Sequence, residues 1–227
     1  MQTPEGFLLV NKPVGLPSFQ VVRKIRYLTK VSRVGFAGTL DPFAGGLLVV
    51  GIGRKFTRRM QEIQDLPKKY DVTMVLGLET DTLDSFGKIT SVGGTGDLDN
   101  VQNVLEGFVG TFDQMPPQFS AKKVDGKRAY KMARSGESVE LRPASVSVYS
   151  MSLETLSRHT HPQIRFSVKC SKGTYVRSLV RDIGTAMGSC AYTKNLVREE
   201  IGQFSYHNAL AYRDLNTETI QQHIFYD

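Results

Sequence analysis

The stretch GFAGTLDPFAGGLLVVGIG, residues 35–53, places one carboxylate, Asp41, among glycines and apolar residues and follows it with a proline. An Asp before Pro often marks only a turn, because the residue before proline is pushed out of the α region and Asp accepts local backbone hydrogen bonds. The alternative is that the glycines let a backbone or a ligand approach closely, and that Asp41 is a reactive group at the floor of a cleft. The apolar run LLVVGIG that follows is typical of a central strand.

Length and composition bound the class of protein. The 227 residues contain 40% hydrophobic residues, enough for an ordinary globular core, and we expect one domain over residues 1–227. Cys170 and Cys190 are too few and too unpatterned for a disulfide framework, so we expect free thiols in a reducing compartment. The N-terminus lacks a signal peptide and no apolar stretch is long enough for a bilayer, so the sequence predicts a cytoplasmic protein with no membrane contact.

The placement of the basic residues says more than the net charge of +7. They gather in five segments, at 21–30, 53–60, 67–70, 121–134 and 168–177. Several of these segments include a tyrosine or a phenylalanine, the mixture expected where phosphates are neutralised and bases are stacked. Although a charge run is usually a solvated helix face, five of them favour a polyanionic partner.

Hydrophobic periodicity predicts more strands than helices. The predicted strands cover 7–10, 47–53, 69–78, 87–92, 144–153 and 163–170, and the predicted helices cover 18–30, 55–64, 101–108 and 173–188. Ser18 is a candidate cap of the first helix. The strands are joined by hairpins as often as by helical crossovers, which indicates an α+β fold with a mixed sheet. The polar, basic segment 118–144 is predicted to be an exposed arm.

Several chemistries lack the residues they need. All four histidines lie in the last third of the chain, and no Cys, Asp or Glu is spaced to complete a metal site or a Ser-His pair with them. The glycine-rich loop has no Gly-Lys-Ser/Thr ending, and GIGRKF lacks the third glycine of a dinucleotide fingerprint. We therefore expect neither a metal nor a cofactor, and the remaining candidates are carboxylate, arginine and tyrosine side chains.

Arg177 is predicted to lie in the first turn of the helix over 173–188. The positive end of the helix dipole disfavours a cation there unless an anion compensates it. Asp41 is the natural partner, because an arginine fork can hold a carboxylate ionised and oriented. The alternative for Arg177 is an exposed surface arginine.

Several motifs, in order along the chain, resemble those of a known family. GFAGTLDPFAGGLL resembles the Gly-His-x-Gly-x-Leu-Asp-Pro-x-Ala-x-Gly-x-Leu signature of the TruB family of tRNA pseudouridine synthases, in its bacterial type. Six further motifs follow the family's order, namely NKPVG, KKYDV, TDTLDSFGK, PPQFSAKKVDGKRAYKMARSGE, CSKGTYVRSLVRDIG and LVREEIGQF. The resemblance implies a pseudouridine synthase fold, with a central mixed, mainly antiparallel sheet flanked by helices and loops and a thumb-like basic arm inserted at about 118–144.

The resemblance also implies a reaction, the conversion of uridine 55 in the tRNA T loop to pseudouridine without a cofactor. The uracil is flipped out, cut from the ribose, turned and rejoined through carbon. Asp41 matches the catalytic nucleophile, a carboxylate beside an anomeric carbon as in glycosidases. Arg177 matches the arginine that pairs with it, Tyr70 the tyrosine that stacks on the uracil, and Tyr175 an active-site tyrosine near the base.

The resemblance also implies residues that bind RNA and residues that support the catalytic loop. The expected RNA-binding residues are Phe36, Lys123, Lys127, Tyr130, Arg134 and Lys172. Phe36 stands where the family has histidine, and it can still stack on RNA. Lys12 and Pro13 match the KPxG motif, which supports the catalytic loop.

The expected partner is the T stem-loop of tRNA, bound by a monomer. About twenty residues follow GQF, which leaves no room for the appended C-terminal RNA-binding PUA domain of many relatives. That feature and Phe36 motivate a rival hypothesis, a tRNA-binding folding chaperone with weak or no catalysis. The protein core of a guided RNA-modifying particle is a third possibility, but it would need longer appended segments. The intact set of Asp41, Arg177, Tyr70 and Tyr175 favours the enzyme.

Overall fold

The computed structural model describes residues 4–120, 123–124, 127–128 and 141–226. It divides into two compact units, which we describe separately. Unit 1 comprises Met1–Asp71 and Leu196–Asp227, and unit 2 comprises Val72–Asn195. The single catalytic domain expected over 1–227 stays a prediction.

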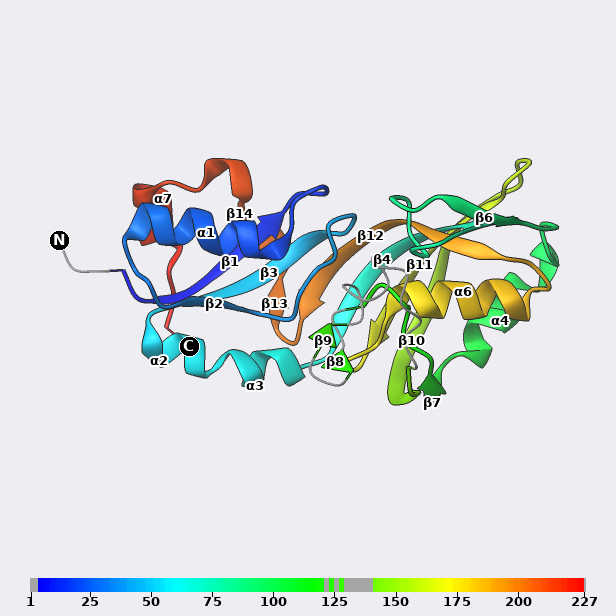
Figure 1. Ribbon diagram of the computed structural model, residues 1–227, viewed down its shortest axis with the longest axis horizontal. Coiled ribbons are helices and arrows are strands. Elements are labelled where there is room, and N and C mark those ends of the chain that lie inside the picture. Colours follow the sequence, from blue (N-terminus) through cyan, green and yellow to red (C-terminus); the bar gives the residue numbers. More distant parts are fainter. Residues whose placement is uncertain (1–3, 121–122, 125–126, 129–140, 227) are drawn as a thin grey trace. The chain divides into compact units, whose positions relative to one another are not determined.

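Helices and strands follow one another as labelled in Figure 1. Their bounds are β1 Gly6–Lys12, α1 Ser18–Thr29, β2 Val34–Ala37, β3 Gly45–Ile52, α2 Arg54–Arg58, α3 Met60–Asp65, β4 Lys68–Leu76, β5 Leu78–Thr80, β6 Ile89–Val92, α4 Val101–Gly107, β7 Gly110–Gln114, β8 Lys123–Val124, β9 Lys127–Arg128, β10 Ala144–Ser157, β11 Gln163–Cys170, α6 Val176–Ala186, β12 Ala191–Ile201, β13 Phe204–Ser205, β14 Leu210–Ala211 and α7 Thr217–His223. Short 3-10 turns at Leu98–Asn100, Tyr206–Asn208 and Tyr212–Asp214 join some of them.

The sheet of unit 1 is built around β3, the strand predicted from LLVVGIG. The strand order is β14–β1–β3–β12, with β2 also on β3 and β13 on β12. One edge of β3 pairs with β1, from Gly46 to Ile52. The other edge pairs first with β12, at Gly45 and Gly46, and then with β2, from Val49 to Ile52. The segment between β2 and β3, which carries Asp41, therefore lies where β12 gives way to β2 along the same edge.

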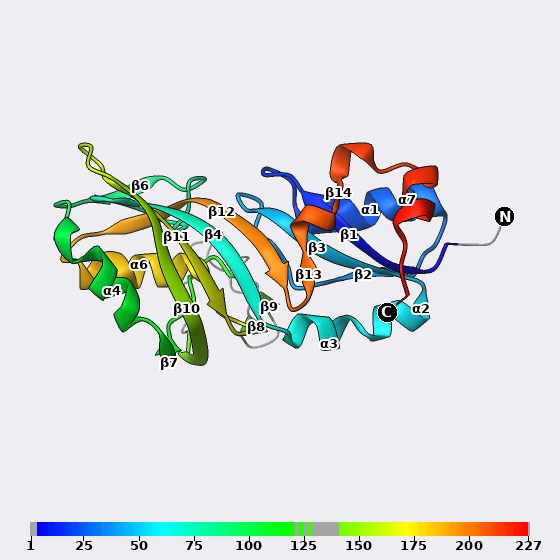
Figure 2. The ribbon, with the colours of Figure 1, turned by 180° about the vertical axis from the view of Figure 1, so that it is seen from behind.

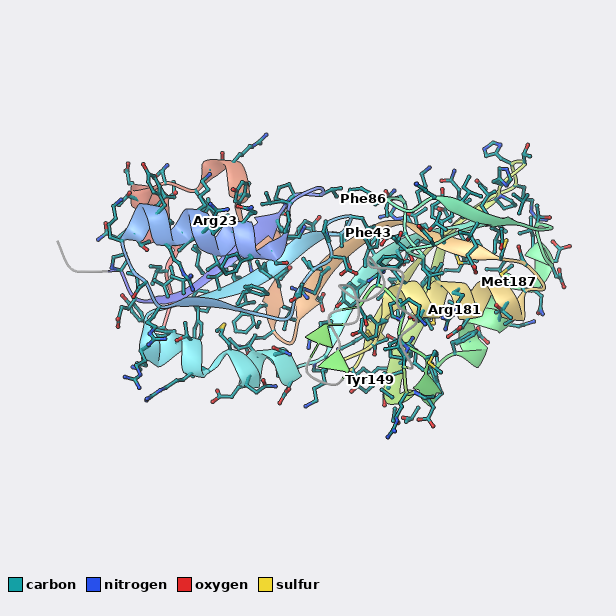
Figure 3. All side chains as sticks on the ribbon, in the orientation of Figure 1. Arg23, Phe43, Phe86, Tyr149, Arg181 and Met187 are labelled. Carbon is teal, nitrogen blue, oxygen red and sulfur yellow. The ribbon has the colours of Figure 1, made fainter. Side chains whose placement is uncertain are left out.

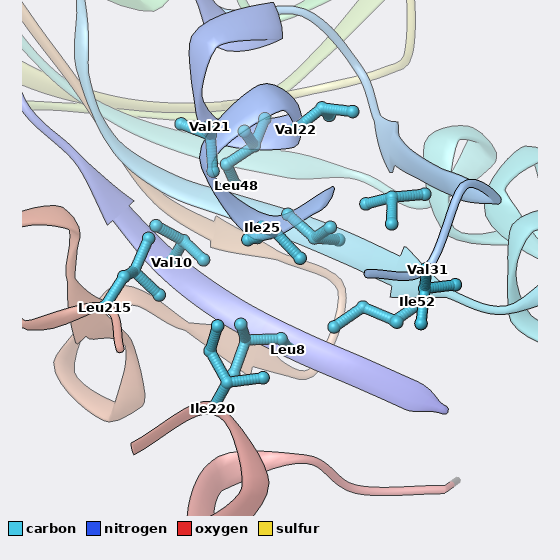
Figure 4. Packing of buried hydrophobic residues seen from close by; sticks show 12 residues of the cluster. Leu8, Val10, Val21, Val22, Ile25, Val31, Leu48, Ile52, Leu215 and Ile220 are labelled. Carbon is cyan, nitrogen blue, oxygen red and sulfur yellow. The ribbon is translucent and has the colours of Figure 1, made fainter. Parts of the chain in front are cut away.

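Both faces of this sheet are buried. Alternate residues of a strand point to opposite faces. Leu8 and Val10 of β1 pack in a cluster with α1 and with Ile220 of α7 (Figure 4). Phe7 and Leu9 pack in a second cluster with side chains of α2 and α3. The continuous apolar runs in β1 and β3 follow from this burial on two sides, because neither face has to be polar.

Unit 2 contains a long antiparallel hairpin, β10–β11, in a sheet of order β12–β4–β11–β10–β7. Figures 1 and 2 show α6 against one face of this sheet. The helix buries Val176, Leu179, Val180 and Ile183, which recur at helical spacing within the predicted helix over 173–188, and Met187 at its end is also buried (Figure 3). The period-3.6 pattern thus identified the packed face correctly.

The α+β fold class with a mixed, mainly antiparallel sheet is confirmed. The strand pairs β1–β14 and β12–β3 are parallel, as is the isolated bridge between Asp84 and Thr193, and the other strand pairs whose register is described are antiparallel. Among the described residues, no helix is long and apolar enough to cross a membrane.

Two local predictions are wrong. The helix expected over 55–64 is two helices, because the Arg59 N–H bonds to the Phe56 carbonyl three residues back and closes α2 with a tight turn. Ser18 is not a helix cap: it is the first residue of α1, and Pro17 occupies the cap position.

Candidate active site

Asp41 lies in the loop between β2 and β3, which is fastened by backbone hydrogen bonds. The Asp41 carbonyl accepts the Ala44 N–H at 3.1 Å, and the Pro42 carbonyl accepts the Gly15 N–H at 2.7 Å. The second bond ties the loop to the turn that follows β1. Asp41 is half-buried, whereas Phe43, two residues later, is buried (Figure 3). The Asp-Pro turn is therefore held in place by its backbone hydrogen bonds.

Ser18 fixes the same loop from α1. Its buried Oγ donates to the Leu40 carbonyl at 2.9 Å and accepts the Leu40 N–H at 3.0 Å. Both backbone groups of the residue before Asp41 are thus satisfied by one hydroxyl. The hydroxyl does not cap α1 because it bonds to the backbone of Leu40, 22 residues later in the sequence.

Lys12 is a fully buried cation at the end of β1. Its Nζ donates to the Pro13 carbonyl at 3.0 Å and to the Leu16 carbonyl at 2.7 Å, across the KPVG turn. Burial lowers the pKa of Lys12 to about 8, the negative charge of Asp41 opposes this shift, and the positive charge of Arg198 adds to it. The supporting role expected for Lys12 and Pro13 stays a prediction.

Arg198 on β12 is a second buried cation of unit 1, and the sequence did not single it out. Its Nε donates to the Leu47 carbonyl at 2.8 Å and its Nη2 to the Gly38 carbonyl at 2.9 Å. Burial lowers the pKa of the guanidinium, and a side-chain hydrogen bond to Tyr70 on β4 opposes that shift. Unit 1 thus brings together Asp41, Lys12, Arg198 and Tyr70.

Phe36 takes part in the core of unit 1. It stands on β2 opposite Val50 of β3, is half-buried, and packs against the cluster that contains Leu8 and Ile25. Part of the ring is therefore used for packing. Its predicted contact with RNA stays a prediction.

Arg177 of unit 2 is buried, so the alternative of an exposed surface arginine is wrong. It is the second residue of α6, and its Nη1 lies 3.5 Å from Oδ2 of Asp84. Nη1 also donates to the Thr82 carbonyl at 2.7 Å, and Nη2 donates to the Phe119 carbonyl at 2.9 Å. A carboxylate does compensate this arginine, as the helix dipole requires. Asp41 belongs to the other unit, so its pairing with Arg177 stays a prediction.

Asp84 is itself fixed by the turn TDTLDSFG. Its Oδ1 accepts the Thr82 hydroxyl at 2.8 Å and the Phe86 N–H at 3.0 Å. Its backbone carbonyl accepts the Thr80 hydroxyl at 2.8 Å. The turn therefore presents one carboxylate oxygen to Arg177 and holds the other.

Tyr175, at the cap position of α6, is held through its backbone. The Tyr175 N–H donates to Oε1 of Gln114 at 2.8 Å, and Nε2 of Gln114 donates to the Tyr175 carbonyl at 3.1 Å. Gln114 ends β7 and is buried. Lys172 is exposed in the turn between β11 and α6. Unit 2 thus brings Tyr175, Arg177 and Asp84 to the start of one helix.

The remaining predicted residues belong to the arm. Lys123 on β8 and Lys127 on β9 stand in a two-stranded ladder, in which Val124 pairs with Lys127. Tyr130 and Arg134 lie outside the described residues. Within the described part of the chain, no three His, Cys, Asp or Glu side chains gather as a metal site requires.

A weak sequence signal existed for the residues that were missed. Arg198 lies in the same inward phase of β12 as Leu196. Gln114 ends an extended segment two residues before Pro116 and Pro117. A polar residue on a buried face must find hydrogen-bond partners. Sequence periodicity indicates which face of a strand is buried, but it does not indicate which groups a polar residue on that face will bond to.

Comparisons with known proteins identify the family to which this sequence is similar. Residues 26–176 match the family described as TruB family pseudouridylate synthase (N terminal domain). The chain is 40% identical to "tRNA pseudouridine synthase B" of Protochlamydia amoebophila over 95% of this chain and 81% of that protein. It is 42% identical to the protein of the same name from Chlamydia pneumoniae, over 90% and 86%.

Among solved structures, the chain is similar to a Cbf5-Nop10-Gar1 complex, with a TM-score of 0.71 and 27% identity over 92% of this chain. It is also similar to an H/ACA RNP bound to a substrate RNA, with a TM-score of 0.69 and 25% identity over 92% of this chain. It spans about half the length of these two solved chains, 53% and 52% respectively.

Proposed function

Because the chain belongs to the TruB family of pseudouridylate synthases, we propose that it isomerises a uridine of tRNA to pseudouridine, and that this uridine is position 55 in the T loop. The relatives named tRNA pseudouridine synthase B support the tRNA substrate, since they match over more than four fifths of their own length. The chain's surplus of positive charge suits a polyanionic substrate.

The observation that carries the proposal is the setting of Asp41. The loop is fixed by backbone bonds and by Ser18, and Lys12 and Arg198 supply positive charge around it. The negative charge of Asp41 interacts favourably with the positive charge of Lys12. A fixed carboxylate suits a step in which positive charge develops on a sugar carbon, because the transition state then needs no reorganisation of the protein.

The reaction balances without a cofactor. The C1′–N1 bond breaks, Asp41 bonds to the sugar or base or stabilises the cationic sugar, and the uracil turns. A C1′–C5 bond then forms, the proton on C5 leaves to solvent, and N1 takes up a proton. No electrons are gained or lost overall, so acid–base groups and binding energy suffice.

The tyrosines and Arg177 are proposed to serve the base and the carboxylate. A base inside the T loop must leave its stack before a side chain can reach it, and an aromatic ring can receive it. We assign this stacking to Tyr70 and a contact near the base to Tyr175, and we assign to Arg177 the orientation of Asp41. Lys172, Lys123 and Lys127 are proposed to meet RNA phosphates.

The test is tritium release from a tRNA transcript that carries [5-³H]uridine. The protein is expected to release one equivalent per tRNA, and a transcript with cytidine at position 55 is expected to release none. Release that persists from the cytidine transcript would contradict position 55. Binding without any release would contradict the enzyme and favour the folding chaperone.

A further inference from the structure

Arg198 is the largest of the fully buried side chains in the described part of the protein, and 1% of its surface is exposed. Removing a guanidinium from water is costly unless its donors are satisfied. Such a residue is retained where its hydrogen bonds hold something in place. Its partners therefore indicate its role.

Those partners bracket the Asp41 loop. Gly38, whose carbonyl accepts from Nη2, comes directly after β2, and Leu47, whose carbonyl accepts from Nε, lies in β3. One planar group thus joins the chain three residues before Asp41 to the chain six residues after it. A guanidinium is suited to this because its donors have fixed directions.

Gly46 shows how closely β12 approaches the loop. It pairs with Arg198 in the parallel ladder and has a φ of +100°. A Cβ at Gly46 would lie 2.3 Å from the Arg198 carbonyl oxygen and 2.7 Å from the Arg198 nitrogen. Only glycine permits this contact, so the backbone of the loop's end and the backbone of Arg198 are held against each other.

The same guanidinium reaches Tyr70. The hydrogen bond between Arg198 and Tyr70 links β12 to β4 within unit 1. Tyr70 is the residue proposed to stack on the uracil, and Asp41 the one proposed to react. Arg198 therefore bonds both to Tyr70 and to the backbone on either side of Asp41.

We propose that Arg198 is a positioning residue that sets the Asp41 loop relative to Tyr70, so that the carboxylate and the stacked base meet in the reactive geometry. This inference rests on the proposed function. Arg198 acts through the Gly38 and Leu47 carbonyls and the Tyr70 side chain. Its geometry matters beyond its charge, because two carbonyls in different directions must be bonded at once.

Two variants and one control test this. Arg198→Met removes the donors, Arg198→Lys keeps the charge but lacks the fork, and Arg213→Met alters an arginine of the same unit whose side chain is 87% exposed. The first readout is amide hydrogen exchange at Leu40 and Ala44, which needs no RNA. The second is the single-turnover rate of tritium release together with the dissociation constant for tRNA, both measured well below each variant's melting temperature.

We expect exchange at Leu40 and Ala44 to rise in both Arg198 variants and not in Arg213→Met. We expect the single-turnover rate to fall by about 10-fold to 100-fold in both, with the dissociation constant unchanged, since a displacement of about 1 Å can cost that much. A lysine that restores the full rate would overturn the positioning role. So would unchanged exchange, or a rate loss that only follows the fraction of unfolded protein.

A measurement on the unaltered protein covers the case in which Arg198→Met does not fold. The Arg198 Nε–H is expected to exchange with water much more slowly than that of exposed Arg213, and equal rates would overturn the proposal. If the unaltered protein releases no tritium, the proposed function fails and the catalytic part of this inference fails with it. The exchange readouts then still decide whether Arg198 holds the loop.

Discussion

Arg177 and Asp84 form a buried ion pair in which Nη1 and Oδ2 are 3.5 Å apart, and each partner has further hydrogen bonds. The pair joins the first turn of α6 to the turn TDTLDSFG, 93 residues earlier in the chain. Removing one partner of a buried pair leaves the other charge uncompensated, which costs more than the intact pair contributes.

Asp84→Asn is therefore expected to lower the free energy of unfolding by about 3–5 kcal/mol. The matched control is Asp99→Asn, which breaks the exposed pair between Asp99 and Arg158 in the same unit and should cost less than about 1 kcal/mol. Urea denaturation of both variants checks this. Equal losses in the two variants would contradict the buried pair.

Lys12 makes stability depend on pH in the alkaline range. Its pKa is about 8 in the folded protein and near 10.5 in the unfolded chain. Between these values the unfolded chain binds more protons at Lys12 than the folded protein does, so stability rises with pH. The free energy of unfolding, taken relative to Lys12→Met, is expected to rise between pH 8 and about 10.

Asp41 supplies the control for that prediction. Its negative charge raises the pKa of Lys12, so Asp41→Asn is expected to lower that pKa further and to move the start of the rise below pH 8. Denaturation at a series of pH values, or NMR titration of the Lys12 ammonium, measures the shift. If the rise in stability began at the same pH in Asp41→Asn as in the unaltered protein, Asp41 and Lys12 would not interact.

Gln114 is expected to control the presentation of Tyr175. Gln114→Leu leaves the Tyr175 N–H and carbonyl without these partners and should cost about 1–3 kcal/mol. Gln114→Glu keeps an acceptor for the N–H but, as a carboxylate, cannot donate to the carbonyl. Both variants should lower the single-turnover rate.

The control for Gln114 is Gln102→Leu, which removes an exposed hydrogen bond to Glu106 and should change neither stability nor rate. Thermal denaturation and tritium release measure the two effects. The role assigned to Gln114 would be contradicted if Gln114→Leu kept the stability and the rate of the unaltered protein.

The elements that the sequence predicted well are those whose burial shows directly in the apolar pattern. The strand LLVVGIG is a continuous apolar run that is buried on both faces, and the inward stripe of α6 repeats every 3.6 residues. The break between α2 and α3 was not predicted, because a tight turn at Arg59 leaves no mark in the apolar pattern.

The candidate site was predicted only in part for a related reason. Glycines and a proline marked the Asp41 loop, and the helix dipole indicated that Arg177 needs an anionic partner. Which carboxylate Arg177 meets depends on tertiary contacts, and Asp84 was not foreseen. Ser18, Gln114 and Arg198 act by hydrogen bonds to distant backbone groups, which no local pattern records.

Asp41 is the carboxylate proposed to perform the reaction. The most direct measurement is tritium release from [5-³H]uridine tRNA by the unaltered protein, by Asp41→Asn, and by Asp214→Asn as a half-exposed control in the same unit. We expect the unaltered protein and Asp214→Asn to release label, and Asp41→Asn to bind the tRNA and release none. Release by Asp41→Asn at the rate of the unaltered protein would show that the Asp41 carboxylate is not needed for the reaction.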